Sequence, residues 1–232
     1  MNLSISKPDL VSYVNRQLDV FFPDGASIGD LARIIDVALG RLEYCFSHIR
    51  VKRFFDDRGP SFDHLHTDQY AMFLYFVSNS AFKAEHLPLA KKAFALNKAL
   101  HAVDILYEVN LPDIFCLAHP MGTTLGRASY GDYFCCYHNC TVGSNLEGEY
   151  PTLGRGVVMY SGSRVTGRSR IADNTFVATG AIIRDRMELP GNSVLYGASP
   201  DIGVSATKRN VMRDVFRMNA AEQYNSDALV VD

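Results

Sequence analysis

One feature constrains the fold of this 232-residue chain more than any other: a six-residue repeat that runs through residues 153–183. Every sixth position there is apolar, namely Leu153, Met159, Val165, Ile171, Val177 and Ile183. The residue four places after each of the first five is small: Val157, Ser163, Ser169, Thr175 and Ala181. A period of six fits neither an α-helix nor a simple strand. It is typical of a β-helix, in which short strands stack in successive coils.

The repeat has a steric explanation. Three six-residue units form the three faces of a triangular prism, and the apolar residue of each unit points into it. The small residue lies near a corner, where a larger side chain would collide with the interior. Because each coil buries its apolar side chains against its neighbours, several repeats are needed for stability. The register extends upstream through Val142 and Cys136, and Ile105, Leu111 and Leu117 again repeat at six.

Two irregularities interrupt the repeat: one residue is missing between Leu125 and Cys136, and the polar stretch 144–152 leaves the register as a loop.

The first hundred residues have helical spacing instead of a six-residue repeat. Helices are expected from Pro8, after a cap at Ser27 with Asp30, and over the ranges 68–85, capped by Thr67, and 90–101. The polar segment 56–61 is expected to be a link.

We therefore predict an α+β chain in three parts. An N-terminal α-helical domain occupies residues 1–102, and a left-handed parallel β-helix of hexapeptide repeats occupies residues 103–200. A short C-terminal tail covers residues 201–232, in which residues 207–221 have the pattern of a capping helix.

Composition and charge limit the classes of protein and the cellular compartment that this chain fits. A net charge of −2 gives no indication of general nucleic-acid binding, and no apolar run is long enough to span a bilayer. The first residues lack the basic start and apolar core of a signal peptide. Five cysteines, an odd number without a CxxC pair, indicate reduced thiols and a cytoplasmic protein. No metal is expected, because His64 and His66 alone make a poor zinc site and Cys136 and Cys140 fit an inward and a corner position of the repeat.

The candidate catalytic base is His119, since an imidazole accepts a proton near neutral pH. Asp104 precedes it by fifteen residues, close to one full coil, so the two side chains are expected to meet on neighbouring coils. A carboxylate there would fix the tautomer of the imidazole and stabilise the imidazolium. The alternative is a surface histidine that caps a turn.

Five segments carry a resemblance to a known family. They are VDI at residues 103–105, HPMG at 119–122, YHNCTVG at 137–143, GVVMYSGS at 156–163 and YGASP at 196–200. These resemble the VDI, HATG, LQSVTLG, GVMIGAGA and AGVPA segments of the serine O-acetyltransferases, members of the hexapeptide-repeat acyltransferase superfamily. The resemblance runs from about residue 68 to residue 200.

The resemblance implies an acetyl-CoA-dependent O-acetyltransferase. His119 would be the general base and Asp104 its partner, so that an acceptor hydroxyl attacks the thioester directly. CoA would lie in a groove between adjacent prisms. The matching pantetheine contacts are Gly143, Ser161, Gly162, Thr179 and Gly180, with Lys208 and Arg209 near the CoA phosphates unless they only form a solvated basic face. The resemblance also implies a homotrimer with sites between subunits; a dimer of trimers is left open.

The sequence differs from the family at the positions that would bind the acceptor. Ala118 stands where the family has an acid, and Glu149-Tyr150-Pro151 stand where it has Arg-His-Pro. Without these charges a zwitterion would be poorly neutralised. We therefore expect a hydroxyl or amine of a sugar or sugar nucleotide, as in surface-polysaccharide synthesis. The candidate acceptor-binding residues are His138, Glu149, Tyr150, Asp63 and Asp68.

Three other functions compete with this one. A true serine O-acetyltransferase of cysteine biosynthesis would take free serine despite the altered residues. A non-catalytic β-helix scaffold would use the prism only for assembly. A zinc carbonic anhydrase of the β-helix type needs further histidines beside His138, and the following residues are Asn139 and Cys140.

Overall fold

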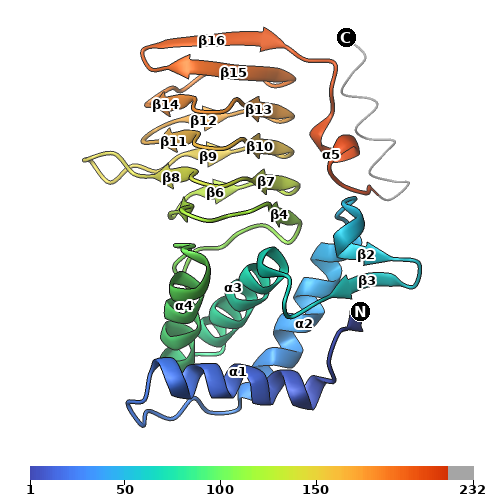
Figure 1. The fold of residues 1–232 in the computed structure, drawn as a ribbon. Helices are drawn as coiled ribbons and strands as arrows, with labels where there is room; N and C mark the ends of the chain where they lie inside the picture. The colour runs from blue at the N-terminus through green and yellow to red at the C-terminus, as the bar shows by residue number, and fades with distance from the viewer. Residues whose placement is uncertain (219–232) are drawn as a thin grey trace.

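The computed structural model describes residues 1–218, which form a helical domain with a parallel β-helix stacked on it (Figure 1). None of the helices within this described part has both the length and the apolar character needed to cross a membrane. The four long helices are α1 (Lys7–Phe21), α2 (Leu31–Ser47), α3 (Thr67–Lys83) and α4 (Leu87–His101).

The helices begin where side chains cap them. Pro8 lies in the first turn of α1, as expected. The cap of α2 is Asp30 rather than Ser27, and its side chain accepts a hydrogen bond from Arg33 N. His66, not Thr67, caps α3, and α4 begins three residues before the predicted start.

The segment predicted as a link is part of a small sheet. The short helix η1 (Lys52–Phe54) precedes β2 (Phe55–Asp56), which pairs antiparallel with β3 (Gly59–Phe62). The first strand, β1 (Asn2–Leu3), then pairs parallel with β3. The sequence concealed β3, because a four-residue strand that starts with glycine and proline lacks an alternating apolar pattern.

The β-helix has three faces of short parallel strands. The first face contains β4 (Phe115–Leu117), β7 (Phe134–Cys136), β10 (Val157–Met159), β13 (Thr175–Val177) and β15 (Ser193–Ala198). The second contains β5 (Thr124–Leu125), β8 (Thr141–Gly143), β11 (Arg164–Thr166) and β14 (Ile182–Arg184). The third contains β6 (Ser129–Tyr130), β9 (Thr152–Leu153) and β12 (Arg170–Ile171).

The register confirms the hexapeptide repeat. Val157 pairs with Thr175 and Arg164 with Ile182, so one regular coil takes eighteen residues. All six repeat residues between 153 and 183 are at most 2% exposed, as are the five small residues that follow at the fourth place. The side chains of the repeat therefore form one continuous buried column.

The end of the β-helix differs from the predicted tail. Strand β16 (Asp201–Ala206) folds back antiparallel on β15, so regular structure continues beyond residue 200. The predicted capping helix is reduced to α5 (Val211–Asp214), and its last residues, 219–221, lie outside the described residues. The chain then returns to the helical domain, where Phe216 pairs with Ile49 at the end of α2 (Figure 1).

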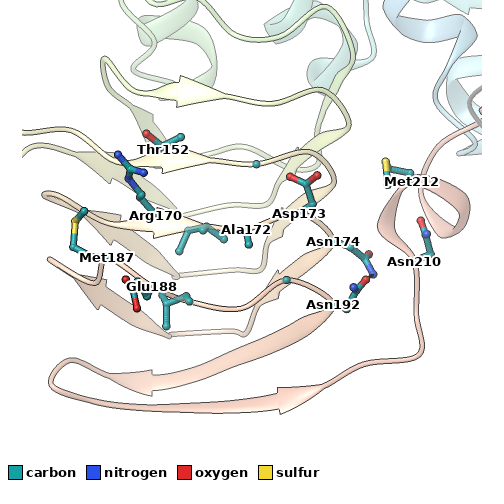
Figure 2. Close-up of a pocket in the computed structure, with 14 residues that line it drawn as sticks. Thr152, Arg170, Ala172, Asp173, Asn174, Met187, Glu188, Asn192, Asn210 and Met212 are labelled. Atoms are coloured by element: carbon teal, nitrogen blue, oxygen red, sulfur yellow. Dashed lines mark hydrogen bonds between the residues drawn. The ribbon is translucent and has the colours of Figure 1, made fainter. Parts of the chain in front are cut away.

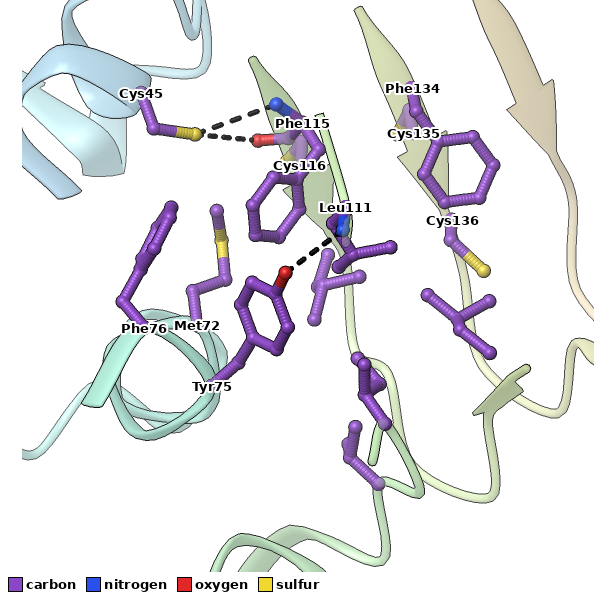
Figure 3. Packing of buried hydrophobic residues seen from close by; sticks show 14 of the residues in the cluster. Cys45, Met72, Tyr75, Phe76, Leu111, Phe115, Cys116, Phe134, Cys135 and Cys136 are labelled. Carbon is purple, nitrogen blue, oxygen red and sulfur yellow. Dashed lines mark hydrogen bonds between the residues drawn. The ribbon is translucent and has the colours of Figure 1, made fainter. Parts of the chain in front are cut away.

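The helical domain and the first coil share one core. The Tyr75 hydroxyl of α3 donates to Val109 O at 3.0 Å and accepts from Leu111 N at 2.9 Å. The Cys45 thiol of α2 donates to the carbonyl of Phe115, the first residue of β4 (Figure 3). All five cysteines are free and buried. These contacts hold α2 and α3 against the segment that leads into β4 and against the first residue of that strand.

Candidate active site

The turn that carries His119 is longer than its equivalents in the other coils. Thr141 follows Cys136 by five positions, and Arg164 follows Met159 by the same spacing. In the first coil, Thr124 follows Leu117 by seven positions, although these two residues occupy the same register positions. The two extra residues displace His119 from the corner of the prism. A spacing of eight between Leu117 and Leu125, in place of six, is the sequence signal of this insertion.

The backbone and exposure of His119 set it apart from a core residue. Its φ is +49°, in the left-handed region that non-glycine residues seldom adopt. Its side chain is 62% exposed, yet Nδ1 lies 3.5 Å from the carboxylate Oδ2 of Asp68, a side chain that is only 7% exposed. The ring is therefore anchored on one edge, and its other nitrogen, Nε2, is available to solvent or substrate.

Together with Asp68, His119 lines a cavity of about 200 Å³ between the two domains. Thr67 and Asp68 come from the first turn of α3, Leu100 and His101 from the last turn of α4, and His119, Pro120 and Met121 from the turn after β4. The site thus combines elements that are about fifty residues apart in the sequence.

His101 is a site residue that the sequence did not indicate. Asn97 donates its amide to Ala71 O at 2.9 Å, so its Oδ1 faces His101 Nδ1 at 2.8 Å as an acceptor. His101 must then donate from Nδ1, which leaves its Nε2 as a hydrogen-bond acceptor. Burial lowers the pKa of His101, although the charge of Asp68 opposes this effect.

Asp104, the predicted partner of the base, has a different neighbour. Its Oδ2 accepts a hydrogen bond from Lys98 Nζ at 2.6 Å, and its side chain is 36% exposed. Among residues 1–218, no hydrogen bond or ion pair joins Asp104 to His119. The structure brings Asp68 to His119 instead, and the catalytic role of Asp104 stays a prediction. The register explains the difference, because Asp104 bridges to Thr124 of the next coil, five positions after His119.

Most of the predicted CoA contacts follow one corner of the prism. Backbone hydrogen bonds join Gly162 N to His138 O and Gly180 N to Ser161 O, each at 3.0 Å, so the turns stack coil on coil. Ser161 Oγ also lies 3.4 Å from His138 Nδ1. Gly162 and Gly180 have φ values of +73° and +71°, and no atom lies within 4 Å of the Cβ position of Gly180. This corner is therefore open along Ser161, Thr179 and the two glycines.

The loop predicted to choose the acceptor projects from a different corner. Glu149 accepts from Asn145 at 2.8 Å and approaches Arg168 at 3.8 Å. Tyr150 lines a separate cavity of about 360 Å³ with Glu108 and Arg127. Gly143 ends β8 on this second face. Within one protomer, the structure does not bring this loop to the His119 cavity, since the two cavities share no lining residue.

Three further predicted residues lie apart from the His119 cavity. Asp63 is exposed, and its carboxylate accepts from Leu65 N. Lys208 and Arg209 are both exposed after β16. The carbonyl of Arg209 accepts a hydrogen bond from Asn174 Nδ2 at 2.9 Å, and its guanidinium lies 3.8 Å from Asp214.

Other candidate sites have less support. Over the described range 1–218, no three histidine, cysteine or acidic side chains gather as a metal-binding group. His64 pairs with Ser4 and His66 caps α3, so each member of the His64-x-His66 pair has a structural partner. A larger groove of about 530 Å³ lies along the third face, beside Arg170 and Met212 (Figure 2). None of the predicted site residues lines it.

Comparisons with known proteins agree with this architecture. No protein-family model matches the chain. A putative serine acetyltransferase of Schizosaccharomyces pombe is 27% identical over 107 residues, a match that covers 44% of this chain and 39% of that protein. The chain therefore aligns with less than half the length of this curated relative.

Two solved structures match over most of the chain. A serine acetyltransferase of Neisseria gonorrhoeae superposes with a TM-score of 0.64 at 18% identity and covers 90% of this chain and 84% of its own. A serine acetyltransferase of Brucella abortus in complex with coenzyme A gives a TM-score of 0.58 at 12% identity, with coverages of 87% and 76%. The chain has the hexapeptide-repeat, parallel β-helix fold of the serine acetyltransferases.

Proposed function

We propose that the chain is an acyl-CoA-dependent acetyltransferase in which His119 is the general base. The observation that carries this proposal is the placement of His119: it stands on a lengthened turn, anchored through Nδ1 by a buried carboxylate, beside a cavity at the junction of two domains. A histidine held in this way presents Nε2 as a proton acceptor. The fold shared with serine acetyltransferases supports the same chemistry.

The residues of this chain would act in a fixed order. Nε2 of His119 accepts the proton of the acceptor hydroxyl, whose oxygen then becomes nucleophilic. The buried carboxylate stabilises the imidazolium that forms. His119 can then return the proton to the leaving group. Acetyl-CoA, when bound, would supply the thioester carbonyl that the hydroxyl attacks. No side chain needs to be acetylated in this sequence.

The open corner fits a long, narrow cosubstrate. Ser161, Gly162, Thr179 and Gly180 would line the pantetheine arm, because the glycines leave room for it and the hydroxyls offer hydrogen bonds. Arg209, and Lys208 beside it, would attract the CoA phosphates. The Brucella abortus structure in complex with coenzyme A supports acetyl-CoA as the cosubstrate.

A homotrimer would complete the site. His119 and the loop with Glu149 and Tyr150 lie at different corners of one prism, so the loop of one subunit can contribute only to a site on its neighbour. Closed threefold symmetry would form three such sites at three equivalent interfaces. Gly143 would then border the same interface from the second face.

We propose that the acceptor is a small molecule with a reactive hydroxyl. More specifically, we propose a sugar or sugar nucleotide, because Ala118 replaces the acid, and Glu149 and Tyr150 replace the Arg and His, that would neutralise a zwitterion. Free serine, the acceptor of a serine O-acetyltransferase, is the second candidate, because Asp68 supplies an acid to the cavity and could compensate for Ala118.

The first prediction concerns His119. We expect His119→Ala to lower the rate of CoA release from acetyl-CoA by about 10²–10⁴-fold, which is the usual contribution of a general base. Release would be followed with a thiol reagent against a panel of sugars, sugar nucleotides and amino acids, including serine.

His48→Ala is the matched control, because His48 contacts Tyr44 O and Ser47 at the end of α2 and lies outside the cavity. If His119→Ala retained full acetyl transfer, the proposed mechanism would be wrong. If the wild-type protein transferred acetyl to no acceptor in the panel, the scaffold function would gain support.

A further inference from the structure

The carboxylate that positions the base comes from the helical domain. We infer that Asp68 of α3, rather than Asp104 of the β-helix, holds His119 in the tautomer and orientation that catalysis needs. This inference rests on the proposed role of His119 as general base. It assigns Asp68 as a positioning residue that acts through the imidazole.

The position of Asp68 in α3 suits a buried carboxylate. Asp68 is the second residue of this helix, two positions after the cap at His66. The positive end of the helix dipole stabilises a negative side chain there. With 7% of its side chain exposed, the carboxylate is screened little by solvent, so its attraction for a nearby proton donor is strong. The Nδ1–Oδ2 distance of 3.5 Å is within the range of an ion pair between His119 and Asp68.

Asp104 is poorly placed for the same role. Lys98 Nζ already donates to its Oδ2 at 2.6 Å, so its charge is compensated. Its backbone is also fixed in the first coil, because Asp104 N donates to Thr123 O and Asp104 O accepts from Leu125 N. With 36% of its side chain exposed, the Asp104–Lys98 pair contributes little beyond a solvent-screened contact.

His101 does not compete with His119 for an ion pair with Asp68. Burial lowers the pKa of His101, which therefore stays neutral near pH 7, and its Nδ1–H is used by Asn97. A neutral ring that donates elsewhere does not form an ion pair with Asp68. Among the residues that the structure describes, His119 is the one ion-pair partner of Asp68.

The arrangement has a defined chemical consequence. With the carboxylate of Asp68 facing Nδ1, the neutral ring of His119 carries its proton on Nδ1, and Nε2 keeps its lone pair. An asparagine at position 68 can turn its NH₂ group toward Nδ1 and so favour the opposite tautomer, in which Nε2 is protonated and cannot act as a base.

The test combines a spectroscopic and a kinetic measurement on the full-length protein. Two-bond ¹H–¹⁵N spectra of protein labelled at histidine distinguish Nδ1–H from Nε2–H, with His119→Ala used to assign the signal. We expect Nδ1–H in the wild type and a shift to Nε2–H in Asp68→Asn. We also expect kcat to fall by about a hundredfold or more in Asp68→Asn, with a smaller change in the KM for acetyl-CoA.

Three comparison variants keep the result interpretable. Asp68→Glu retains the carboxylate and should recover at least part of kcat together with the Nδ1–H form. Asp57→Asn removes an exposed charge from the turn between β2 and β3 and should match the wild type. Asp104→Asn is the competing arm, and we expect a smaller change in tautomer and rate than in Asp68→Asn.

The inference is overturned if Asp104→Asn, and not Asp68→Asn, changes the tautomer of His119. It is also overturned if Asp68→Asn folds normally and leaves both the tautomer and kcat as in the wild type. Because the tautomer is read without any substrate, this result is independent of the acetyl-transfer assay. A wild-type protein without transferase activity would refute the proposed function, while the tautomer data would still decide whether Asp68 holds His119.

Discussion

At the residue scale, the cavity depends on two histidines with opposite surroundings. His119 is largely exposed and faces a carboxylate, whereas His101 is half-buried and donates to a neutral amide. Local environment therefore sets the two rings apart: His119 faces a buried carboxylate, whereas burial lowers the pKa of His101. The hydrogen-bond chain from Ala71 through Asn97 to His101 fixes the second ring before any substrate arrives.

A pH dependence of stability follows from His101. Its pKa is near 6.5 in an unfolded chain and lower in the folded protein, mainly because of burial. Between these two pKa values the unfolded chain binds more protons, so acidification favours unfolding. The stability that the folded protein has with neutral His101 is fully present above about pH 6.5 and is lost as the pH falls through the folded-state pKa of His101.

We expect the urea midpoint of the wild type to decrease between about pH 7.5 and pH 5.5 more steeply than that of His101→Gln. Both would be measured by circular dichroism at constant ionic strength. Equal slopes for the two proteins would show that burial of His101 is not coupled to folding.

At the scale of elements, the strands are too short to be stable alone. Most contain two or three residues, and each depends on the coils above and below it. The packing of their inward side chains therefore contributes more to the stability of the β-helix than the few hydrogen bonds of each strand suggest. Ile182 and Ile183 in β14 show this difference within one strand, since Ile183 is fully buried in the prism and Ile182 is half-buried on its outer side.

We expect Ile183→Ala to lower the free energy of unfolding by about 2–5 kcal/mol, since it leaves a cavity in the packed column. Ile182→Ala removes the same atoms from the neighbouring position and should cost about 1 kcal/mol or less. Denaturant titration of both variants measures the difference. Similar losses at the two positions would contradict the assignment of inward and outward sides.

At the scale of the whole molecule, the β-helix places the candidate site residues at different corners of the prism. The helical domain brings some of them together. The turn of His119 meets α3 and α4 at one end of the prism, while the loop at Tyr150 leaves another corner. The core shared by Tyr75, Leu111 and Phe115 holds the helical domain in place, so that Asp68 reaches the turn after β4 (Figure 3).

This separation predicts complementation between subunits. His119→Ala and a variant lacking residues 145–149 should each be inactive alone. When the two are unfolded, mixed in equal amounts and refolded, about a quarter of the wild-type activity should return, because each half of a site between symmetric neighbours is intact in half of the cases.

The control is the same mixture without unfolding, in which the subunits do not exchange. A mixture that stays inactive after refolding, while refolded wild type is active, would place His119 and the loop in sites within single subunits. Sedimentation measurements on the same samples would give the number of subunits.

The six-residue repeat determined the β-helix and its inward side chains, and the helical spacing of the first hundred residues determined the helical domain before it. Such features can be predicted because they depend on local periodicity and on the burial of apolar residues at fixed spacing. The sequence also indicated His119 as the candidate base, and the spacing of eight between Leu117 and Leu125 marks the two extra residues in its turn.

Only the tertiary structure decided which groups surround that base. The sequence indicated Asp104 as the partner because it lies close to one coil before His119, and it indicated Asp68 only as a candidate acceptor-binding residue. In the folded chain Lys98 engages Asp104, and the docking of α3 brings Asp68 to Nδ1. The physical reason is that contacts between domains depend on how two packed surfaces meet, and no periodicity within either domain records that geometry.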